Sequence, residues 1–444
     1  MPFDLLIRNG KIVTSQGVDP GDVAISGGKI VAVGEIPGAE AEETIDAKGL
    51  LVMPGVIDTQ VHFREPGMEH KEDLESGTRS AILGGVTTIF EMPNTNPTTT
   101  SKEALEDKLK RAAGRAWCDY GFFVGASADN LDELGNLELL PGSPGIKIFM
   151  GSSTGSLLVG DDDMVKKALK NGIRRVSVHS EDEPRLRERK EHFASSTNPA
   201  DHPLIRDAES ARLSTERLLR ISEETGRPVH ILHVSSLDEI PLIRRAKRQV
   251  GRVTAEVTPQ HLYFHGPEAY EKLGTHAQMN PPIRSKEHQD ALWAALADGV
   301  FDVFGSDHAP HTLEEKAKPY PQSPSGMPGV QTMLPVLLAF VSQGRLTLED
   351  VARMGSENPA RLFGLRDKGT ISEGFDADLV LVDPKRKTVF ERGMVASKCG
   401  WSPYEGDTFT GWPLRVILRG RTVMQEGHVV GQPSGQAAQY NWKE

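Results

Sequence analysis

Cysteine is scarce in this chain of 444 residues, which contains only Cys118 and Cys399. The two lie far apart and neither belongs to a CxxC pair. The sequence therefore argues against a disulfide framework, a thiolate zinc site and an iron–sulfur cluster. Any metal ion must be bound through nitrogen and oxygen ligands.

Long apolar runs and basic clusters are also missing. No apolar segment approaches the roughly 20 residues needed to cross a bilayer, and the opening MPFDLLIRNGKIV lacks the basic and apolar regions of a secretion signal. A net charge of −11, without a Lys/Arg run that offsets it, argues against nucleic-acid binding. We expect a cytoplasmic protein with small-molecule partners and no membrane or nucleic-acid partner.

Short β-rich runs alternate with helix-favouring segments between residues 52 and 310. The β-rich runs occupy 52–63, 86–94, 118–127, 145–151, 175–182, 229–236, 252–259 and 301–310. The helix patterns between them occupy 71–84, 102–115, 162–171, 206–225, 237–249 and 286–298. This alternation predicts the α/β class, and eight units predict a closed (β/α)8 TIM-like barrel whose active site lies at the carboxyl ends of the strands.

The two ends of the chain have a different pattern. Residues 1–51 contain short strands punctuated by Gly, Asp and Pro, and the same pattern returns after about residue 368. We therefore predict one small composite β-domain from 1–51 and 368–430, beside a barrel of 52–367. Residues 431–444 are polar and rich in Gly, Ser and Gln, and they are predicted to be a flexible extension.

The segment DTQVHFREPG places polar side chains at the end of the first predicted barrel strand. Alternate side chains of an extended strand share a face, so Asp58, Gln60 and His62 are expected to point into the same interior. A histidine at this place is able to meet ligands from other strands.

Three further strand ends carry residues that suit a metal ion. His179 and His233 each come late in an apolar strand, and Asp307 ends the eighth strand. A lone histidine at a strand end is more often a hydrogen-bonded core residue, but four ends that converge in one barrel favour a metal centre with His62. Asp307 could simply cap a turn, yet an aspartate here can also bind metal and shuttle a proton.

Lys147 lies in the fourth predicted strand. An inward lysine in a barrel must be paired, deprotonated or chemically changed, so the simplest alternative is a salt bridge. Addition of carbon dioxide to a neutral amine would give a carbamate with two oxygens that can bridge two divalent ions. Such a centre would carry a net positive charge and attract an anionic substrate.

The segments HFREPG, EMPNTNP, GIKIFMG, HSED, HVSS, MNPPIR and GSDHAPH together resemble the dihydroorotases of the amidohydrolase superfamily. The similarity spans nearly the whole chain. It implies a (β/α)8 barrel with a composite β-domain, one or two zinc ions, and the reversible cyclisation of N-carbamoyl-L-aspartate to L-dihydroorotate in pyrimidine biosynthesis. We also expect a homo-oligomer, and a transcarbamoylase is a candidate partner.

The resemblance also implies roles for individual residues. The metal ligands fall on His62, carbamylated Lys147 as the bridge, His179, His233 and Asp307. Recognition of the substrate carboxylate falls on Arg64, Asn94 and His311, and pyrimidine-ring contacts fall on Asn280. The alternatives are an Arg64 ion pair with a glutamate, a turn cap at Asn94 and a surface-loop histidine at residue 311.

Gln60 departs from the family pattern, which has a second metal-binding histidine there. An amide oxygen is a poorer zinc ligand than imidazole, so the sequence leaves open a binuclear enzyme, a mononuclear enzyme and a catalytically silent relative that supports a partner enzyme. A hydantoinase or allantoinase type of cyclic amidase is the alternative enzyme. Arg64 favours dihydroorotate, because an uncharged ring needs no cation beside His62.

Overall fold

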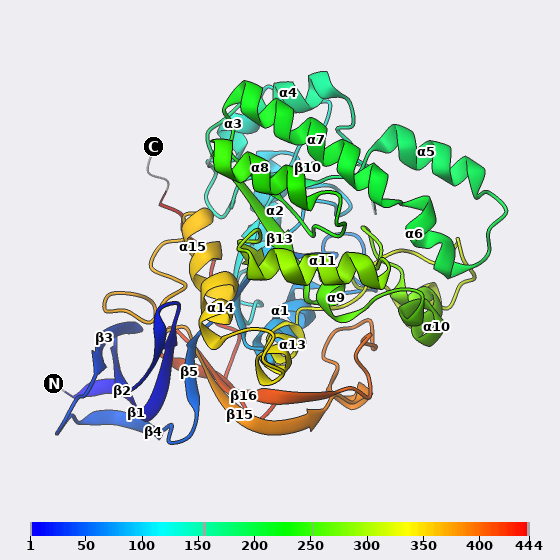
Figure 1. Cartoon of the computed structure of the whole chain (residues 1–444). Coiled ribbons are helices and arrows are strands. Elements are labelled where there is room, and N and C mark those ends of the chain that lie inside the picture. The colour runs from blue at the N-terminus through cyan, green and yellow to red at the C-terminus, as the bar shows by residue number, and fades with distance from the viewer. Residues whose placement is uncertain (1, 154–156, 251, 442–444) are drawn as a thin grey trace.

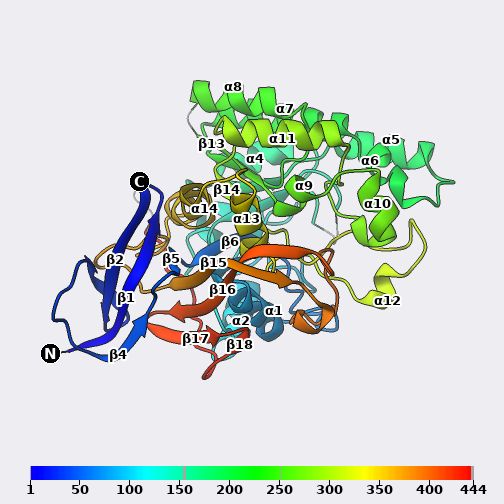
Figure 2. The ribbon, with the colours of Figure 1, turned by 60° about the horizontal axis from the view of Figure 1, so that its bottom comes forward.

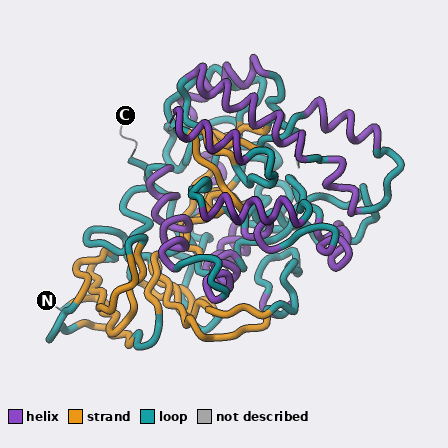
Figure 3. The backbone as a smooth tube through the Cα atoms, in the orientation of Figure 1, coloured by secondary structure: helices purple, strands orange, loops and turns teal. Residues whose placement is uncertain are grey.

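The structure is a computed structural model that describes residues 2–153, 157–250 and 252–441 (Figure 1). Figure 3 shows short strands at the centre of the larger part of the molecule with helices outside them. Among the described residues the barrel strands are β6 (Val56–Val61), β7 (Val86–Glu91), β8 (Asp119–Phe122) continued by β9 (Val124–Gly125), β10 (Ile146–Phe149), β11 (Val176–His179), β12 (Val229–Ile231), β13 (Val253–Val257) and β14 (Val303–Phe304).

The strands pair in parallel in chain order. One run joins β6, β7 and β8, and the other joins β9 through β14. Val61 forms a parallel bridge with His308, and His62 N donates to His308 O at 2.7 Å, which brings the first strand beside the last. The predicted (β/α)8 barrel is thus confirmed. The predicted run 118–127 is divided into β8 and β9 at the buried Phe123.

Each predicted helix between the strands is present. Their bounds are α1 (Leu74–Leu83), α2 (Lys102–Ala112), α4 (Asp162–Lys170), α7 (Ala208–Thr225), α8 (Ile240–Val250) and α11 (Lys286–Ala297). The start of α1 is encoded locally, because Asp73 accepts from the backbone N of Ser76 at 2.8 Å and Ser76 returns a side-chain contact to Asp73 N. The helix stops at Gly84, where a Cβ would lie 2.5 Å from Gln331 O.

Several short helices in the loops were not predicted. They are α3 (Leu134–Leu137), α5 (Glu183–His192), α6 (His202–Ile205), α9 (Pro259–Tyr263), α10 (Glu268–Leu273), α12 (Leu313–Lys316), α14 (Leu348–Ala352) and α15 (Asn358–Leu362), together with the apolar α13 (Met333–Ser342). α5 is charged on nearly all sides and buries only Glu183 and Leu186, so it has no apolar stripe to reveal it.

The second part of the molecule is a sheet built from both ends of the chain. Its strands are β1 (Phe3–Thr14), β2 (Gly17–Ser26), β3 (Lys29–Gly34), β4 (Ala41–Asp46), β5 (Leu51–Pro54), β15 (Leu379–Val389), β16 (Thr408–Leu418), β17 (Arg421–Gln425) and β18 (His428–Val429). The N-terminal and C-terminal strands meet where β5 pairs antiparallel with β15, and Figure 2 shows the two groups side by side.

The C-terminal segment differs from the prediction. We predicted a flexible extension over 431–444, but Tyr120 N donates to Gln436 O, Ala438 N donates to Tyr120 O, and Asn441 N donates to Gly364 O. Ala438 is buried, and the segment therefore packs as part of the fold. Composition did not reveal this, because the partners of these backbone groups are distant in sequence. Residues 442–444 lie outside the described part.

No helix in the described part of the chain is both long enough and apolar enough to span a membrane.

Candidate active site

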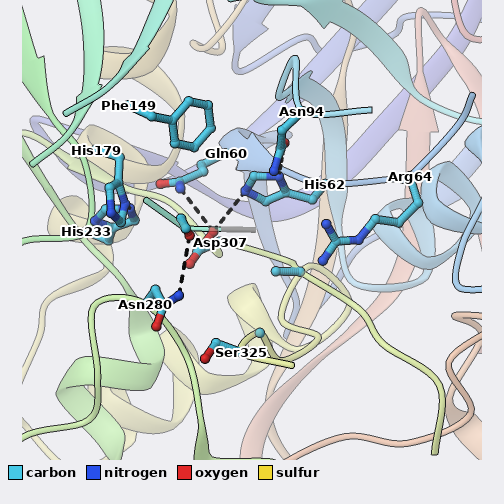
Figure 4. A pocket seen from close by; sticks show the side chains of 13 residues that line it. Gln60, His62, Arg64, Asn94, Phe149, His179, His233, Asn280, Asp307 and Ser325 are labelled. Carbon is cyan, nitrogen blue, oxygen red and sulfur yellow. Dashed lines mark hydrogen bonds and ion pairs between the residues drawn. The ribbon is translucent and has the colours of Figure 1, made fainter. Parts of the chain in front are cut away.

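A pocket lies at the carboxyl ends of the barrel strands. Figure 4 shows side chains from several strands pointing into it. It is lined by Gln60, His62, Arg64, Asn94, Phe149, Ser153, His179, His233, Asn280, Asp307, Ala309, Ser325 and Gly326. Seven of the predicted site residues are thereby brought together. Lys147 and His311 do not line the pocket, but each contacts a residue that does.

Gln60 and His62, at the end of β6, both face Asp307. Gln60 Nε2 donates to Asp307 Oδ1 at 3.0 Å, and His62 Nε2 lies 3.3 Å from the same oxygen. His62 Nδ1 lies 2.7 Å from Asn94 Oδ1, which only accepts, so Nδ1 carries the proton and Nε2 presents a lone pair to the carboxylate. Two facing acceptors require a proton or a cation between them.

A second pair of nitrogen ligands lies across the pocket. His179 Nδ1 is 3.1 Å from His233 Nε2, and His179 Nε2 is 2.9 Å from Glu181 Oε2. Burial lowers the pKa of both histidines, which are therefore neutral at neutral pH. The nearby Glu181 carboxylate favours the proton on His179 Nε2, which leaves the lone pair on Nδ1 to face His233.

Glu181 and Arg206 orient His179, and neither residue was predicted to belong to the site. Arg206 Nε lies 3.1 Å from both carboxylate oxygens of Glu181. Burial favours the neutral acid, but the Arg206 guanidinium and His179 together hold the pKa of Glu181 well below its usual range. The signal for Glu181 was its place two residues after His179 in HSED. Arg206 had no local signal, since it reaches the site from outside the barrel strands.

Lys147 is completely buried on β10. Its Nζ has no hydrogen-bond partner among the described residues and lies 4.5 Å from the centroid of the Phe149 ring. Burial lowers the pKa of this lysine, opposed by the charges of Asp307 and Glu256, and burial raises the pKa of Asp307, opposed by Lys147. A lysine in this setting is shifted toward its neutral, nucleophilic amine.

Three of the site residues have backbone conformations that non-glycine residues rarely adopt. The φ angles are 66° at Arg64, 36° at His233 and 44° at Asp307. The left-handed region is unfavourable for residues with a Cβ, and such residues concentrate at functional sites where the surrounding structure holds them. These backbone conformations direct the side chains of Arg64, His233 and Asp307 into one pocket.

Arg64 is a buried cation at the edge of the pocket and is only 2% exposed. Its Nε donates to Pro310 O at 3.1 Å, and its Nη2 lies 3.3 Å from His311 Nε2. Within the described residues it forms no ion pair with a carboxylate, so the predicted alternative of a pairing with a glutamate is absent there. His311 is fully buried beside Arg64 and supports its guanidinium, and direct contact of His311 with a substrate stays a prediction.

The chemistry of these side chains suits a divalent cation. Among the described residues no three His, Cys, Asp or Glu side chains already form a metal cluster; the donors lie as two pairs, His62 with Asp307 and His179 with His233. Lys147 Nζ and Gln60 Oε1 are buried polar atoms without a hydrogen-bond partner in the described part of the chain. Imidazole nitrogens, a carboxylate and a carbamylated lysine would supply nitrogen and oxygen ligands that suit zinc.

Comparison with known proteins agrees with this fold. A family model described as Amidohydrolase family matches residues 51–423, and the chain belongs to this family. It is 35% identical to a dihydroorotase from Methanothermobacter thermautotrophicus over 96% of each chain. It is 36% identical to an allantoinase from Rubrobacter xylanophilus, over 98% of this chain and 97% of the relative.

A solved structure of L-hydantoinase (dihydropyrimidinase) from Arthrobacter aurescens has the same fold. The match has a TM-score of 0.94 at 31% identity and covers 98% of this chain and 99% of the other. The predicted resemblance to dihydroorotases is thus confirmed at the level of the family. Identity alone does not separate the dihydroorotase from the allantoinase, so the substrate must be argued from the pocket.

Proposed function

We propose that this amidohydrolase acts on a cyclic amide, and specifically that it interconverts L-dihydroorotate and N-carbamoyl-L-aspartate as a dihydroorotase. The observation that carries the proposal is Arg64, a buried guanidinium beside His62 with no carboxylate paired to it in the described residues. Burial of an unpaired cation is unfavourable, so the arrangement favours a ligand that brings its own carboxylate. Both dihydroorotate and N-carbamoyl-L-aspartate do so.

We further propose that zinc is bound by His62, His179, His233 and Asp307, with Lys147 carbamylated. When bound, zinc would polarise the scissile carbonyl and make water more acidic. The protein's own part is to orient the ring and move protons. Asp307 Oδ1 accepts from Gln60 and faces His62, so Oδ2 is the atom available to take a proton from water and pass it to the departing ring nitrogen.

The other groups of the pocket suit ring recognition. Asn280 Oδ1 lies 3.0 Å from His202 Nε2, so the amide is oriented with its nitrogen toward Ser153 at 3.5 Å. An oriented amide offers a donor and an acceptor to the ureide edge of a pyrimidine ring. Arg64 would bind the carboxylate on the opposite side of the pocket, as the side chains in Figure 4 are arranged.

The test is the substrate dependence of an Arg64→Met variant. With dihydroorotate we expect kcat/KM to fall about 100-fold, because charge-assisted hydrogen bonds to the carboxylate are lost. With hydantoin, dihydrouracil and allantoin, which lack a carboxylate, the same variant should change kcat/KM less than about threefold. Absorbance-monitored ring opening with each substrate, beside the zinc content of both proteins, provides the measurement.

A neutral-ring amidase is the second candidate, and the close structural match to an L-hydantoinase favours it. Under that alternative the wild-type protein opens hydantoin faster than dihydroorotate, and Arg64→Met has the same effect on both. A zinc-loaded protein that opens none of the four rings would support the remaining possibility, a catalytically silent subunit.

A further inference from the structure

We propose that Lys316 is a positioning residue that holds the wall of the pocket formed by Asn280 and Ser325. Lys316 ends the short helix α12, which follows the loop of Asp307. Its side chain is completely buried. It does not line the pocket.

The ammonium group of Lys316 is surrounded by backbone carbonyls. Nζ donates to Pro324 O at 2.9 Å, to Gly326 O at 3.1 Å and to Gln278 O at 3.2 Å. An ammonium has three N–H groups and no acceptor, so these three carbonyls satisfy it completely. Within the described residues no carboxylate lies at ion-pair distance, and Nζ lies 5.8 Å from the centroid of the Trp401 ring.

The three carbonyls belong to two segments that form one side of the pocket. One segment leads from Gln278 to Asn280, and the other contains Ser325 and Gly326. Gly326 N also donates to Gln278 O at 2.9 Å, which joins the segments directly. Lys316 therefore sits at the junction of both segments and fixes the distance between the side chains of Asn280 and Ser325.

The sequence explains why a side chain is needed for this task. The segment from 319 to 328 contains four prolines, and proline has no backbone N–H. The segment therefore cannot form a regular ladder with its neighbour, and its buried carbonyls need donors from elsewhere. A lysine supplies three donors from one point, whereas a neutral apolar residue of the same length supplies none.

This wall of the pocket also contacts residues that support the proposed substrate-binding cation. Ser325 O lies 3.0 Å from His311 Nε2, and His311 contacts Arg64. A shift of the segment at 325 would thus reach both the ring-binding wall and the guanidinium proposed to bind the carboxylate. We expect loss of Lys316 to weaken substrate binding. The ligands of the proposed metal should stay in place, because they do not belong to this wall of the pocket.

The experiment compares Lys316→Met with a matched control, Lys368→Met. Lys368 is also buried, but it pairs with Asp119, Asp376 and Asp378 at the interface with the β-domain, away from the pocket. In Lys316→Met we expect KM to rise at least about tenfold while kcat changes less than about threefold. In Lys368→Met we expect lower thermal stability with KM unchanged.

Chemical rescue adds a readout that a structural role would not give. Lys316→Ala leaves a cavity lined by three carbonyls, and ethylammonium should bind there and lower KM toward the wild-type value. Tetramethylammonium has the charge but no N–H, and it should not rescue. Equal effects of the two cations, a KM in Lys316→Met that matches Lys368→Met, or insolubility of both Lys316 variants even in ethylammonium would overturn the proposal.

This inference rests on the proposed function only for the choice of ring. KM is therefore measured with whichever cyclic amide the wild-type protein opens fastest, and the dissociation constant of orotate is measured in parallel by calorimetry. A failure of the dihydroorotase proposal would appear in the wild-type substrate preference. A failure of the Lys316 proposal would appear in the comparison of variants, or in unchanged ligand binding if no ring is opened.

Discussion

At the scale of single residues, Gln60 is the position that decides how closely this site resembles a complete metal centre. Its amide nitrogen is bound to Asp307 Oδ1, and its amide oxygen is buried without a hydrogen-bond partner in the described residues. Figure 4 shows the nitrogen turned toward Asp307 and the oxygen turned away from it. The glutamine thus orients Asp307 and offers one neutral oxygen, where imidazole would be a stronger ligand for zinc.

We predict that Gln60→His increases zinc binding. The new imidazole would lie beside His62 and Asp307, so the variant should hold more zinc per chain after dialysis. Zinc beside residue 60 should bind about tenfold more tightly. Inductively coupled plasma analysis and zinc titration against a chelator provide the measurement. Gln60→Ala is the control and should lose zinc. Equal zinc content in all three proteins would show that residue 60 is not a ligand position.

At the scale of elements, the sequence predicted what is encoded locally. The barrel strands were recognisable as apolar β-rich runs, and the site followed because parallel strands bring their carboxyl ends to one face. His62, His179, His233 and Asp307 were found for that reason. Arg206 and Lys316 were not, because their partners are a distant carboxylate and distant backbone carbonyls that leave no periodic pattern.

The C-terminal segment is a second case in which contacts distant in sequence were not predicted. Its Gly, Ser and Gln content is typical of flexible chain, yet Gln436 and Ala438 pair with Tyr120 of β8. Gly435 permits this contact, since a Cβ at that position would lie 2.0 Å from the backbone oxygen of Cys118. The docking therefore depends on a close backbone approach that only the folded structure reveals.

We predict that Gly435→Ala detaches or displaces this segment. The added Cβ meets backbone, which cannot move aside cheaply, so the free energy of unfolding should fall by about 2 kcal/mol. Thermal unfolding and hydrogen exchange of residues 434–441 provide the measurement. Gly393→Ala is the control, because nothing lies within 4 Å of its Cβ position. An unchanged melting temperature with protected amides would contradict the prediction.

At the scale of the whole molecule, the two parts are held together close to the active site. Ser397, in the C-terminal part of the chain, donates its hydroxyl to the buried Glu72, and Glu72 lies 3.4 Å from His308 Nε2. Trp401 Nε1 donates to His311 O at 2.8 Å. The loop that carries Asp307 and His311 is thus supported from the second part, so loosening that contact would also disturb the pocket.

The whole fold should also be sensitive to acid, because several histidines are buried in neutral form. Burial lowers the pKa of His202 and His261 to about 4. His261 Nε2 lies 3.1 Å from Pro281 O, and His202 Nε2 lies 3.1 Å from Met279 O, so both hold the segment around Asn280. In the unfolded chain each titrates near 6.5, and between pH 6.5 and 4 the unfolded state binds more protons.

We therefore predict that stability is complete above about pH 6.5 and is lost as the pH falls toward 4, by up to about 3 kcal/mol for each of these histidines. Urea midpoints at pH 7.5 and 4.5 provide the measurement. His261→Gln keeps an N–H donor for Pro281 O but does not titrate, so its midpoint should fall less than that of the wild-type protein. His428→Gln changes an exposed histidine and should behave like wild type. If His261→Gln lost as much stability in acid as wild type, protonation of His261 would not be a cause of acid unfolding.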